Sequence, residues 1–380
     1  MRLLVAMAIA LACVATPVSP RPAAAATPVT TAPPPPPPKA WILVDGDTGN
    51  VIDAGNERVR MPPASLTKVV TALAASQLPP DQPITISARA AAAPADKLFM
   101  KAGSVWTADE MVRALLLSSA NDAAIALAEQ VGGSVEGFQA VMARVAQGLG
   151  MGDSPILLDP AGLDGPDGVG GGNFVSARDL AIAGRALLSV PTLASIVATT
   201  VYYFDGPDNV HHRLTNHNKP FLTTYAGAIG LKTGYTSRAG GCLMAAARVN
   251  GRTMLAVVLN GANPNVTAAT LLDKGFATPV SAEDSTERLP AVNGDPLHAV
   301  VAAPGDISSP MATVPAGRPS APGASASAGS ASTPTWLVAL AGALSALVLF
   351  GVAMRLRVRR RRQRRALAES WYWQDQERAA

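Results

Sequence analysis

Three short segments of the sequence carry hydroxyls, amines and an amide in patterns that could perform acyl transfer. The first is Ser65-Leu66-Thr67-Lys68, which places a hydroxyl and an amine three residues apart and therefore on one face of a helix. Backbone N–H groups at the start of a helix favour a developing oxyanion. Because a neutral lysine beside a serine can accept its proton, this segment predicts Ser65 as a nucleophile and Lys68 as its general base.

The other two segments have the composition of a substrate-binding groove. Ser119-Ala120-Asn121 lies between two predicted helices, and Lys232-Thr233-Gly234 ends the apolar predicted strand Ala228–Leu231. Any one of these patterns alone is more often a helix cap, a helix connector or an edge-strand lysine before a turn glycine. Each pattern occurs once, in this order, and two of the seven lysines fall within them. Together they favour an enzyme that forms an acyl intermediate on serine.

The elements around these segments predict an α+β fold, with an antiparallel sheet beside a mostly helical block, over residues 40–277. The expected strands are Trp41–Asp45, Val51–Ala54, Ala228–Leu231, Cys242–Val249 and Thr253–Leu259, with a hairpin turn at Asn250-Gly251. The expected helices are Ser65–Leu78, Thr107–Leu117, Asp122–Val131, Ser134–Leu149, Ser176–Leu188 and Val266–Phe276. Capping boxes are expected at Thr107/Glu110 and Ser176/Asp179. A cleft between the sheet and the helices is the natural place for the three segments.

The three motifs resemble those of the penicillin-recognising serine acyl-transferases, which comprise penicillin-binding proteins and serine β-lactamases. Within that class, residues 40–277 are similar to the low-molecular-mass penicillin-binding proteins of the serine-type D-alanyl-D-alanine carboxypeptidase family. The flanking segments carry the resemblance too: Pro63–Lys68, Ser118–Ala123 and Gly230–Thr236. Asp159–Gly165 is similar to the family's N-P-H-G-L-D segment, with Asp159 in place of Asn and Ala161 in place of His.

The resemblance implies a role in the reaction for four of the motif residues. Ser65 would attack the carbonyl of the penultimate D-alanine of a peptidoglycan stem peptide, with Lys68 as the base. Ser119 would relay a proton to the leaving amine. Asn121 would hold both Lys68 and the substrate amide. Water would then hydrolyse the acyl-enzyme and release the shortened peptide, and β-lactams would act as covalent inhibitors.

The third motif would bind the substrate. By resemblance, Lys232 and Thr233 hold its terminal carboxylate, and Gly234 keeps the strand clear for it. The backbone N–H groups of Ser65 and Tyr235 would form the oxyanion hole. Two family features are missing from the sequence: a small β domain after the catalytic domain, and a carboxylate-binding arginine in Asn263–Thr267.

The ends of the chain predict a single-pass protein of the cell membrane with an extracytoplasmic catalytic domain. Residues 1–26 have the features of a secretory signal peptide, with the apolar run Leu3–Val14 and a small-residue cleavage site at Ala23–Ala26. Trp336–Met354 is uncharged and long enough to cross a bilayer as a helix. The arginine-rich tail, residues 355–380, follows at once, so the positive-inside rule places it in the cytoplasm.

Two low-complexity stretches separate these ends from the core. Residues 27–39 contain six consecutive prolines, which form a stiff spacer. Residues 278–335 are rich in Pro, Ala, Ser and Gly and lack periodicity, and they are expected to be a disordered linker without a second domain, although the segment around Leu289–Val301 leaves room for local order. The catalytic domain would therefore hang on a long tether outside the membrane.

The composition argues against several other classes of function. The net charge of +4 comes from the tail, where residues 355–380 carry nine arginines and three acidic residues, whereas residues 27–335 carry a net charge of −4. The core therefore offers no bulk positive charge to a nucleic acid. With only Cys13 and Cys242 there is no cysteine metal site, and the adjacent His211 and His212 would point to opposite faces of a strand. We expect no metal and no cofactor.

Two other functions are compatible with the same motifs. A serine β-lactamase shares all three, but one class of these enzymes needs a deacylating glutamate between the second and third motifs. Between Asn121 and Lys232 the only glutamates are Glu129 and Glu136, both on predicted helices next to the second motif. A non-catalytic penicillin-binding or wall-binding protein could also use this fold. The intact motifs and the shortness of the segment Ala366–Ala380 weigh against that alternative.

Overall fold

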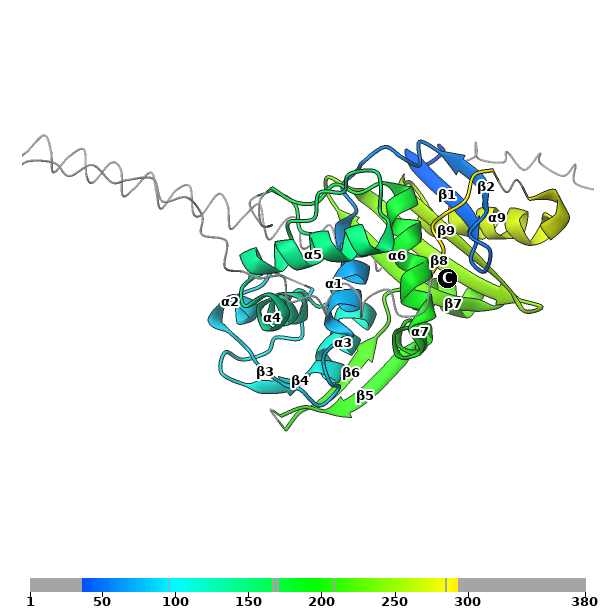
Figure 1. Ribbon diagram of the computed structural model, residues 1–380. Coiled ribbons are helices and arrows are strands. Elements are labelled where there is room, and N and C mark those ends of the chain that lie inside the picture. The colour runs from blue at the N-terminus through cyan, green and yellow to red at the C-terminus, as the bar shows by residue number, and fades with distance from the viewer. Residues whose placement is uncertain are drawn as a thin grey trace, which may run out of the picture. The chain divides into compact units, whose positions relative to one another are not determined.

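A five-stranded antiparallel sheet runs along one side of the structure, in the order β2-β1-β9-β8-β7 (Figure 1). The computed structural model describes residues 36–94, 96–165, 168, 171–207, 209–283 and 286–292, which belong to one compact unit of the chain. The strands are β1 (Ala40–Asp45), β2 (Val51–Gly55), β7 (Ala228–Thr236), β8 (Gly240–Val249) and β9 (Arg252–Gly261). As predicted, strands from both ends of the core meet in one sheet.

The sheet is buried on both of its faces. On β9, Leu255, Val257 and Leu259 pack into the core shared with the helical block. The alternate residues of β9 (Met254, Ala256 and Val258) pack with α9 (Pro264–Ala277) on the opposite face. The turn from β8 to β9 uses Asn250 and Gly251 with φ values of 52° and 81°, as a two-residue hairpin with the strand twist requires.

The helical block is built around α1 (Lys68–Ala75), in which every residue is buried. Four helices contact it: α3 (Ala108–Leu117), α4 (Asn121–Gly132), α5 (Val135–Leu149) and α6 (Ala177–Ser189). Figure 1 shows α1 among these helices, with α6 between it and the sheet. Because close packing leaves little room for movement, Lys68 at the start of α1 has a fixed position.

The structure also contains short elements that were not predicted from the sequence. They are β3 (Pro83–Thr85), α2 (Ala88–Ala91), β4 (Val105–Thr107), α7 (Pro191–Ala198), β5 (Val201–Asp205), β6 (His211–Thr215), α8 (Lys219–Thr224) and the 3₁₀ helix η2 (Val280–Ala282). In the β5–β6 hairpin His212 stacks on its cross-strand partner Phe204, and both rings contact Trp106, from a distant part of the chain, edge-on. Contacts of this kind have no local sequence signature.

Two predicted elements need correction next to the motifs. The helix expected at Ser65–Leu78 is a 3₁₀ helix, η1 (Ala64–Thr67), followed by α1, which ends at Ala75. The strand expected to end at Leu231 continues as β7 to Thr236, because residues Lys232–Thr236 pair with β8. Lys232-Thr233-Gly234 therefore lies within a strand and not after one.

Only one of the two predicted capping boxes is complete. At the start of α3, the Glu110 N–H donates to Thr107 Oγ1 and the Thr107 N–H donates to Glu110 Oε2. At the start of α6, Ser176 Oγ accepts from the Asp179 N–H at 2.9 Å, but the Asp179 carboxylate accepts from the N–H of Asp153 instead. The second box is therefore half formed, because a tertiary contact competes for the Asp179 side chain.

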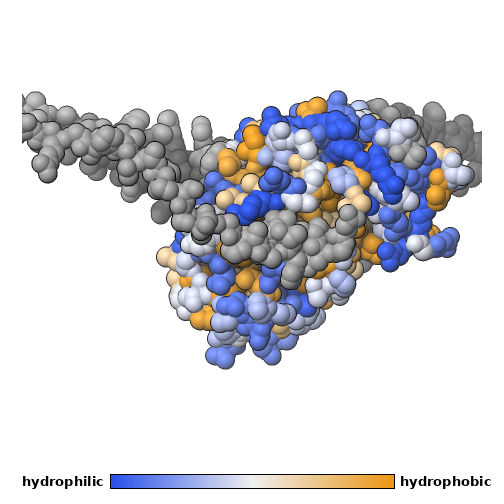
Figure 2. Space-filling view, in the orientation of Figure 1, coloured by the Kyte–Doolittle hydropathy of each residue, from blue (hydrophilic) through white to orange (hydrophobic). Residues whose placement is uncertain are grey.

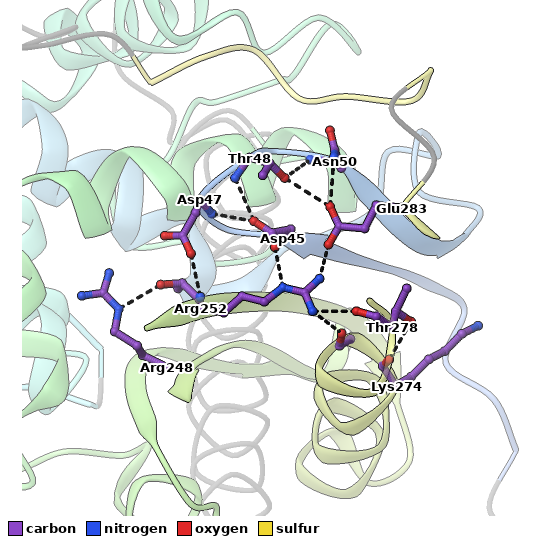
Figure 3. Close-up of polar contacts among 11 residues, drawn as sticks. Asp45, Asp47, Thr48, Asn50, Arg248, Arg252, Lys274, Thr278 and Glu283 are labelled. Carbon is purple, nitrogen blue, oxygen red and sulfur yellow. Dashed lines mark hydrogen bonds and ion pairs between the residues drawn. The ribbon is translucent and has the colours of Figure 1, made fainter. Parts of the chain in front are cut away.

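The predicted linker begins later than residue 278. Residues 278–283 and 286–292, which we call the C-terminal strap, pack on the sheet. The buried carboxylate of Glu283 forms an ion pair with Arg252 of β9 and accepts a hydrogen bond from Asn50 Nδ2 at 2.9 Å. Arg252 Nε also lies 2.9 Å from Asp45 Oδ2, and Figure 3 shows its guanidinium group between the two carboxylates.

Further contacts extend the strap along the β1–β2 hairpin. The Leu289 side chain is buried, and its N–H donates to the carbonyl oxygen of Gly49 at 2.8 Å. Arg185 of α6 donates to the carbonyl oxygen of Pro290 at 2.7 Å. Polar contacts therefore fix residues that composition alone assigned to a disordered linker.

The apolar residues of the described chain lie mainly between its layers. Large hydrophobic side chains that remain exposed come from separate elements, among them Val59, Phe99, Ile156, Tyr203 and Val266. On the face shown in Figure 2, hydrophobic and hydrophilic residues are intermixed. In the part of the chain that the structure describes, no single helix has the length and apolar composition needed to cross a membrane, although α6 and α7, bent by 103°, meet that test as a pair.

Several predictions concern residues outside the described ranges. They are the signal peptide (residues 1–26), most of the proline-rich spacer, the linker beyond residue 292, the membrane span Trp336–Met354 and the tail (residues 355–380). These assignments remain predictions from the sequence.

Candidate active site

Ser65 lies in η1, directly before α1, and its side chain is half-buried. In a 3₁₀ helix, side chains three residues apart lie directly above one another, more closely than on an α-helix. Lys68 Nζ accordingly lies 2.9 Å from Ser65 Oγ. The irregular first turn therefore aligns the predicted nucleophile with the predicted base.

Lys68 is fully buried, and three acceptors surround its amino group. Nζ lies 2.9 Å from Ser65 Oγ, 2.8 Å from Asn121 Oδ1 and 2.7 Å from the carbonyl oxygen of Ala161. Neither of the last two atoms carries a proton. A neutral amine has two N–H bonds and one lone pair, so donation to these two atoms directs its lone pair at the Ser65 hydroxyl.

The second motif lies in the connection between α3 and α4. Ser119 adopts a positive φ of 58°, which is uncommon for a residue other than glycine, and only 3% of it is exposed. The Asn121 N–H donates to the carbonyl oxygen of Asp96 at 2.8 Å. The connection thus turns sharply, and this orients the Asn121 amide toward Lys68.

The third motif lies on β7, which is at the edge of the sheet and contacts η1. A Cβ atom on Gly234 would lie 3.1 Å from both Ala64 Cβ and Ser65 N, so glycine permits the strand to approach the nucleophile. Tyr235 follows, half-buried. In the described sheet no strand pairs with the outer edge of β7, which leaves it available to an extended peptide.

Lys232 and Thr233 present donors beside this edge. Lys232 Nζ donates to the Thr233 carbonyl oxygen at 3.0 Å, and only 1% of Lys232 is exposed. Burial, and secondarily the charge of Lys68, hold the pKa of Lys232 well below its usual value. Thr233 Oγ1 is buried and has no hydrogen-bond partner among the described residues. Such a pair is suited to receive an anionic group.

The loop after Asp159 completes the site, and only its resemblance to a family segment drew attention to it. Asp159 Oδ1 accepts from the N–H groups of Ala161 and Leu163, which shapes the turn that offers the Ala161 carbonyl to Lys68. Asn173 holds this loop in turn, donating to Thr67 Oγ1 at 2.9 Å and to the Asp159 carbonyl oxygen at 2.8 Å. The contact with Lys68 is made by the backbone carbonyl of residue 161 and not by its side chain. Alanine in place of the family's histidine therefore preserves this contact.

Two charged or titratable residues near the motifs were missed by sequence reasoning. Burial lowers the pKa of His217 to about 4; the charges of Lys232 and Lys68 act in the same direction, and Asp96 opposes them. His217 stands between two asparagines in a segment without a motif, so no sequence signal marked it. Asp96 lies in the segment after α2.

In the part of the chain that the structure describes, the histidine pair and the cysteine considered in the sequence show no arrangement of catalytic use. Within the described ranges, no group of three His, Cys, Asp or Glu side chains could hold a metal ion. His211 and His212 are neighbours on β6, one exposed and one half-buried. The Cys242 thiol is free, and burial raises its pKa to about 12, which keeps it unreactive.

Comparison with known proteins identifies the family. The family model described as D-alanyl-D-alanine carboxypeptidase (Peptidase_S11) matches residues 27–263. The chain belongs to this family. Among its curated relatives, D-alanyl-D-alanine carboxypeptidase DacB2 of Mycobacterium tuberculosis is 35% identical over 246 residues, which are 63% of this chain and 82% of the relative. DacF of Bacillus subtilis is 31% identical over 248 residues, and the match covers 63% of this chain but less than two thirds of DacF (62%).

Solved structures of this family share the fold. A D-alanyl-D-alanine carboxypeptidase from Mycobacterium tuberculosis H37Rv is 32% identical, with a TM-score of 0.61 over 67% of this chain and 97% of its own. A mutant of the Streptomyces K15 DD-transpeptidase is 25% identical, with a TM-score of 0.57 over 63% of this chain and 98% of its own. The resemblance inferred from three motifs is confirmed, as is the antiparallel sheet with flanking helices.

Proposed function

We propose that this protein is a serine-type D-alanyl-D-alanine carboxypeptidase that removes the terminal D-alanine from peptidoglycan stem peptides through an acyl-enzyme. The observation that carries the proposal is the position of Lys68 Nζ, 2.9 Å from Ser65 Oγ and beside two acceptors that cannot give it a proton. Membership of the carboxypeptidase family supports the same reaction.

Acylation begins when Ser65 Oγ bonds to the carbonyl carbon of the penultimate D-alanine and Lys68 takes the hydroxyl proton. The carbonyl oxygen becomes an oxyanion, and the N–H groups of Ser65 and Tyr235 stabilise it. The C–N bond then breaks as the proton on Lys68 passes through Ser119 to the leaving amine, which leaves Lys68 neutral for the next step. D-alanine departs, and the rest of the peptide stays attached to Ser65 as an ester.

Deacylation repeats these steps with water as the nucleophile. A water molecule attacks the ester carbonyl, and its proton passes to Lys68. The bond to Ser65 Oγ breaks, the serine regains its proton, and the shortened peptide leaves. A β-lactam would acylate Ser65 in the same way, but its leaving amine stays tethered to the acyl group, which is why we expect stable covalent labelling.

The terminal carboxylate selects the position of cleavage. Lys232 has one hydrogen bond within the described chain and Thr233 Oγ1 has none, so both can donate to a carboxylate. With the peptide extended along the edge of β7, a carboxylate at these residues brings the preceding peptide bond next to Ser65. An enzyme with this subsite acts at the carboxyl end of a peptide.

Release of D-alanine from diacetyl-L-Lys-D-Ala-D-Ala by the purified full-length chain tests the proposal. We expect release by the wild type and none by Ser65→Ala, and we expect a fluorescent penicillin to label only the wild type. If the wild type released no D-alanine yet bound penicillin, a non-catalytic binding protein would be the better assignment.

The same purified protein also tests the β-lactamase alternative. Rapid turnover of nitrocefin, with no acyl adduct accumulating in the mass spectrum, would overturn the carboxypeptidase proposal. Glu136 is exposed and forms an ion pair with Arg89 at 2.9 Å, which is not the position of a deacylating base.

We further propose that the enzyme acts outside the cytoplasmic membrane, anchored by Trp336–Met354. The uncharged length of this segment, the arginines that follow it and the signal-like residues 1–26 support the orientation. Cell fractionation tests it: the full chain should sediment with membranes and resist carbonate extraction, and a chain that ends at Thr335 should not. Recovery of the full chain in the carbonate supernatant would overturn the proposal.

A further inference from the structure

His217 lies in a short segment between β6 and α8 that polar contacts hold rigidly. Asn216 Nδ2 donates to the carbonyl oxygens of Val197 and Thr199 at 3.0 and 2.8 Å. Asn216 Oδ1 accepts from the Asn218 N–H at 2.8 Å. Both asparagines are buried, so these contacts on either side of His217 are shielded from water.

The backbone of His217 is tied to the second catalytic motif. Its N–H donates at 2.9 Å to the carbonyl oxygen of Leu117, which ends α3 two residues before Ser119. The half-buried side chain interacts electrostatically with Lys232, Lys68 and Asp96. His217 therefore belongs to the active site, although none of the three motifs includes it.

The proposed carboxylate-binding site on β7 consists of Lys232 and Thr233. Lys232 uses one of its N–H donors within the described chain, on the Thr233 carbonyl oxygen. Thr233 Oγ1 is buried with no partner there. A terminal carboxylate has two oxygens and accepts up to about four hydrogen bonds. The side chains of Lys232 and Thr233 therefore do not satisfy all of its acceptor sites.

We propose that His217 is the third residue of the carboxylate subsite, with Lys232 and Thr233, and that it takes up a proton when a peptide with a free terminal carboxylate binds. The inference rests on the proposed carboxypeptidase function. His217 does not touch the reacting bond, so it acts as a positioning residue that strengthens binding of the leaving D-alanine.

The charged groups that face His217 determine how its pKa responds when a carboxylate binds. They are Lys232 from β7, Lys68 from α1 and Asp96 from the segment after α2. In the free enzyme the pKa of His217 is about 4, so the ring is neutral at pH 7. A carboxylate beside the ring favours its charged form and raises that pKa. Between the two pKa values binding consumes a proton, so affinity rises as pH falls.

Calorimetry on Ser65→Ala, which cannot turn over the substrate, counts this proton directly. We would titrate diacetyl-L-Lys-D-Ala-D-Ala at pH 5 in two buffers of different ionisation enthalpy, with Ser65→Ala and with Ser65→Ala/His217→Gln. We expect the double variant to bind fewer protons. Equal proton uptake would overturn the inference, because Lys232 alone would then account for it.

Kinetics of the otherwise wild-type enzyme supply the second readout. Since one pKa unit corresponds to a factor of ten, we expect KM to fall about tenfold or more between pH 7.5 and pH 4.5. His217→Gln should lose most of that fall, while the pH profile of kcat keeps its shape. His217→Arg, which carries a permanent charge, should have a low KM across the range. The matched control is His211→Gln, an exposed histidine on β6, which should behave as wild type.

The outcomes separate this inference from the function on which it rests. If the wild type releases no D-alanine, the carboxypeptidase proposal fails. If it releases D-alanine and His217→Gln keeps the wild-type KM at every pH, only the role of His217 fails. A peptide ending in a carboxamide should bind both proteins equally weakly, and a preference of the wild type for that peptide would also overturn the role.

Discussion

Gly162 lies directly against Ala64, the residue that precedes the nucleophile. A Cβ atom on Gly162 would be 2.0 Å from the Ala64 carbonyl oxygen, and Gly162 has a φ of 79°. The carbonyl of the preceding residue, Ala161, binds Lys68. The turn at Gly162 therefore holds the nucleophile and its base at once, and a side chain there would push the two apart.

Gly162→Ala should consequently impair both folding and acylation. We expect at least a tenfold slower reaction with penicillin and a lower melting temperature, because both the contact and the positive φ disfavour alanine. Gly152→Ala is the matched control, since a Cβ there meets nothing closer than 3.9 Å. Wild-type labelling by Gly162→Ala would show that the turn does not position Ser65.

Asn121 can be varied to test the proton balance at Lys68. Asn121→Asp keeps the acceptor 2.8 Å from Nζ but adds a negative charge, which favours the charged ammonium and removes the base. Asn121→Ala removes one acceptor and adds no charge. Acylation at pH 7 should slow roughly 10²–10⁴-fold in Asn121→Asp, the contribution typical of a general base, and recover partly at higher pH. A flat pH profile would contradict this use of the amide.

Asn173 links η1 to the loop after Asp159, and all its hydrogen-bonding groups are used. Its Oδ1 accepts from the N–H groups of Leu158 and Asp159, and its Nδ2 donates to Thr67 and Asp159. Asn173→Ala should lower the free energy of unfolding by roughly 3 kcal/mol, since buried groups lose their partners. Chemical denaturation measures the loss. Because the loop also holds Lys68, labelling should slow even at temperatures where the variant stays folded.

Glu283 anchors the C-terminal strap through Arg252. Its side chain is fully buried, and its removal takes one of two carboxylate partners from Arg252, which keeps Asp45, and takes the acceptor from Asn50 Nδ2. Glu283→Ala should cost about 2 kcal/mol and lower the melting temperature by roughly 4–8 °C, with labelling unchanged in the folded protein. Glu287→Ala, at an exposed ion pair, is the control and should change stability by less than about 1 kcal/mol. Equal effects would mean that the strap is not held by the buried pair.

Asp179 makes the free energy of unfolding depend on pH. Burial, and secondarily the charge of Asp153, raise its pKa to about 6 in the folded protein, well above the value of an exposed aspartate. Between about pH 4 and 6, Asp179 is protonated in the folded protein and ionised in the unfolded chain. The free energy of unfolding therefore falls as the pH rises through this range, and above pH 6 the ionised, buried carboxylate destabilises the folded state. Asp179→Asn should be more stable than wild type at pH 7.5, and the difference should shrink toward pH 4. Thermal melts across that range provide the measurement, and a difference independent of pH would contradict the assignment.

The sequence by itself determined the chemistry and the order of the parts. Residue type decides which groups can attack, accept a proton or bind a carboxylate, and spacing placed Ser65 and Lys68 on one face of a helix. The Thr107 cap and the Asn250-Gly251 turn were also readable, because each depends on residues adjacent in the chain.

Only the tertiary structure decided how these parts meet. The third acceptor of Lys68 is a backbone carbonyl 93 residues away, and a carbonyl has no residue-type signature. The position of Lys232 within β7, the contacts of His217 and the packing of the strap likewise depend on which buried polar group finds a partner across the fold. Burial makes an unpaired group costly, so these long-range pairings fix the geometry, and a local pattern does not encode them.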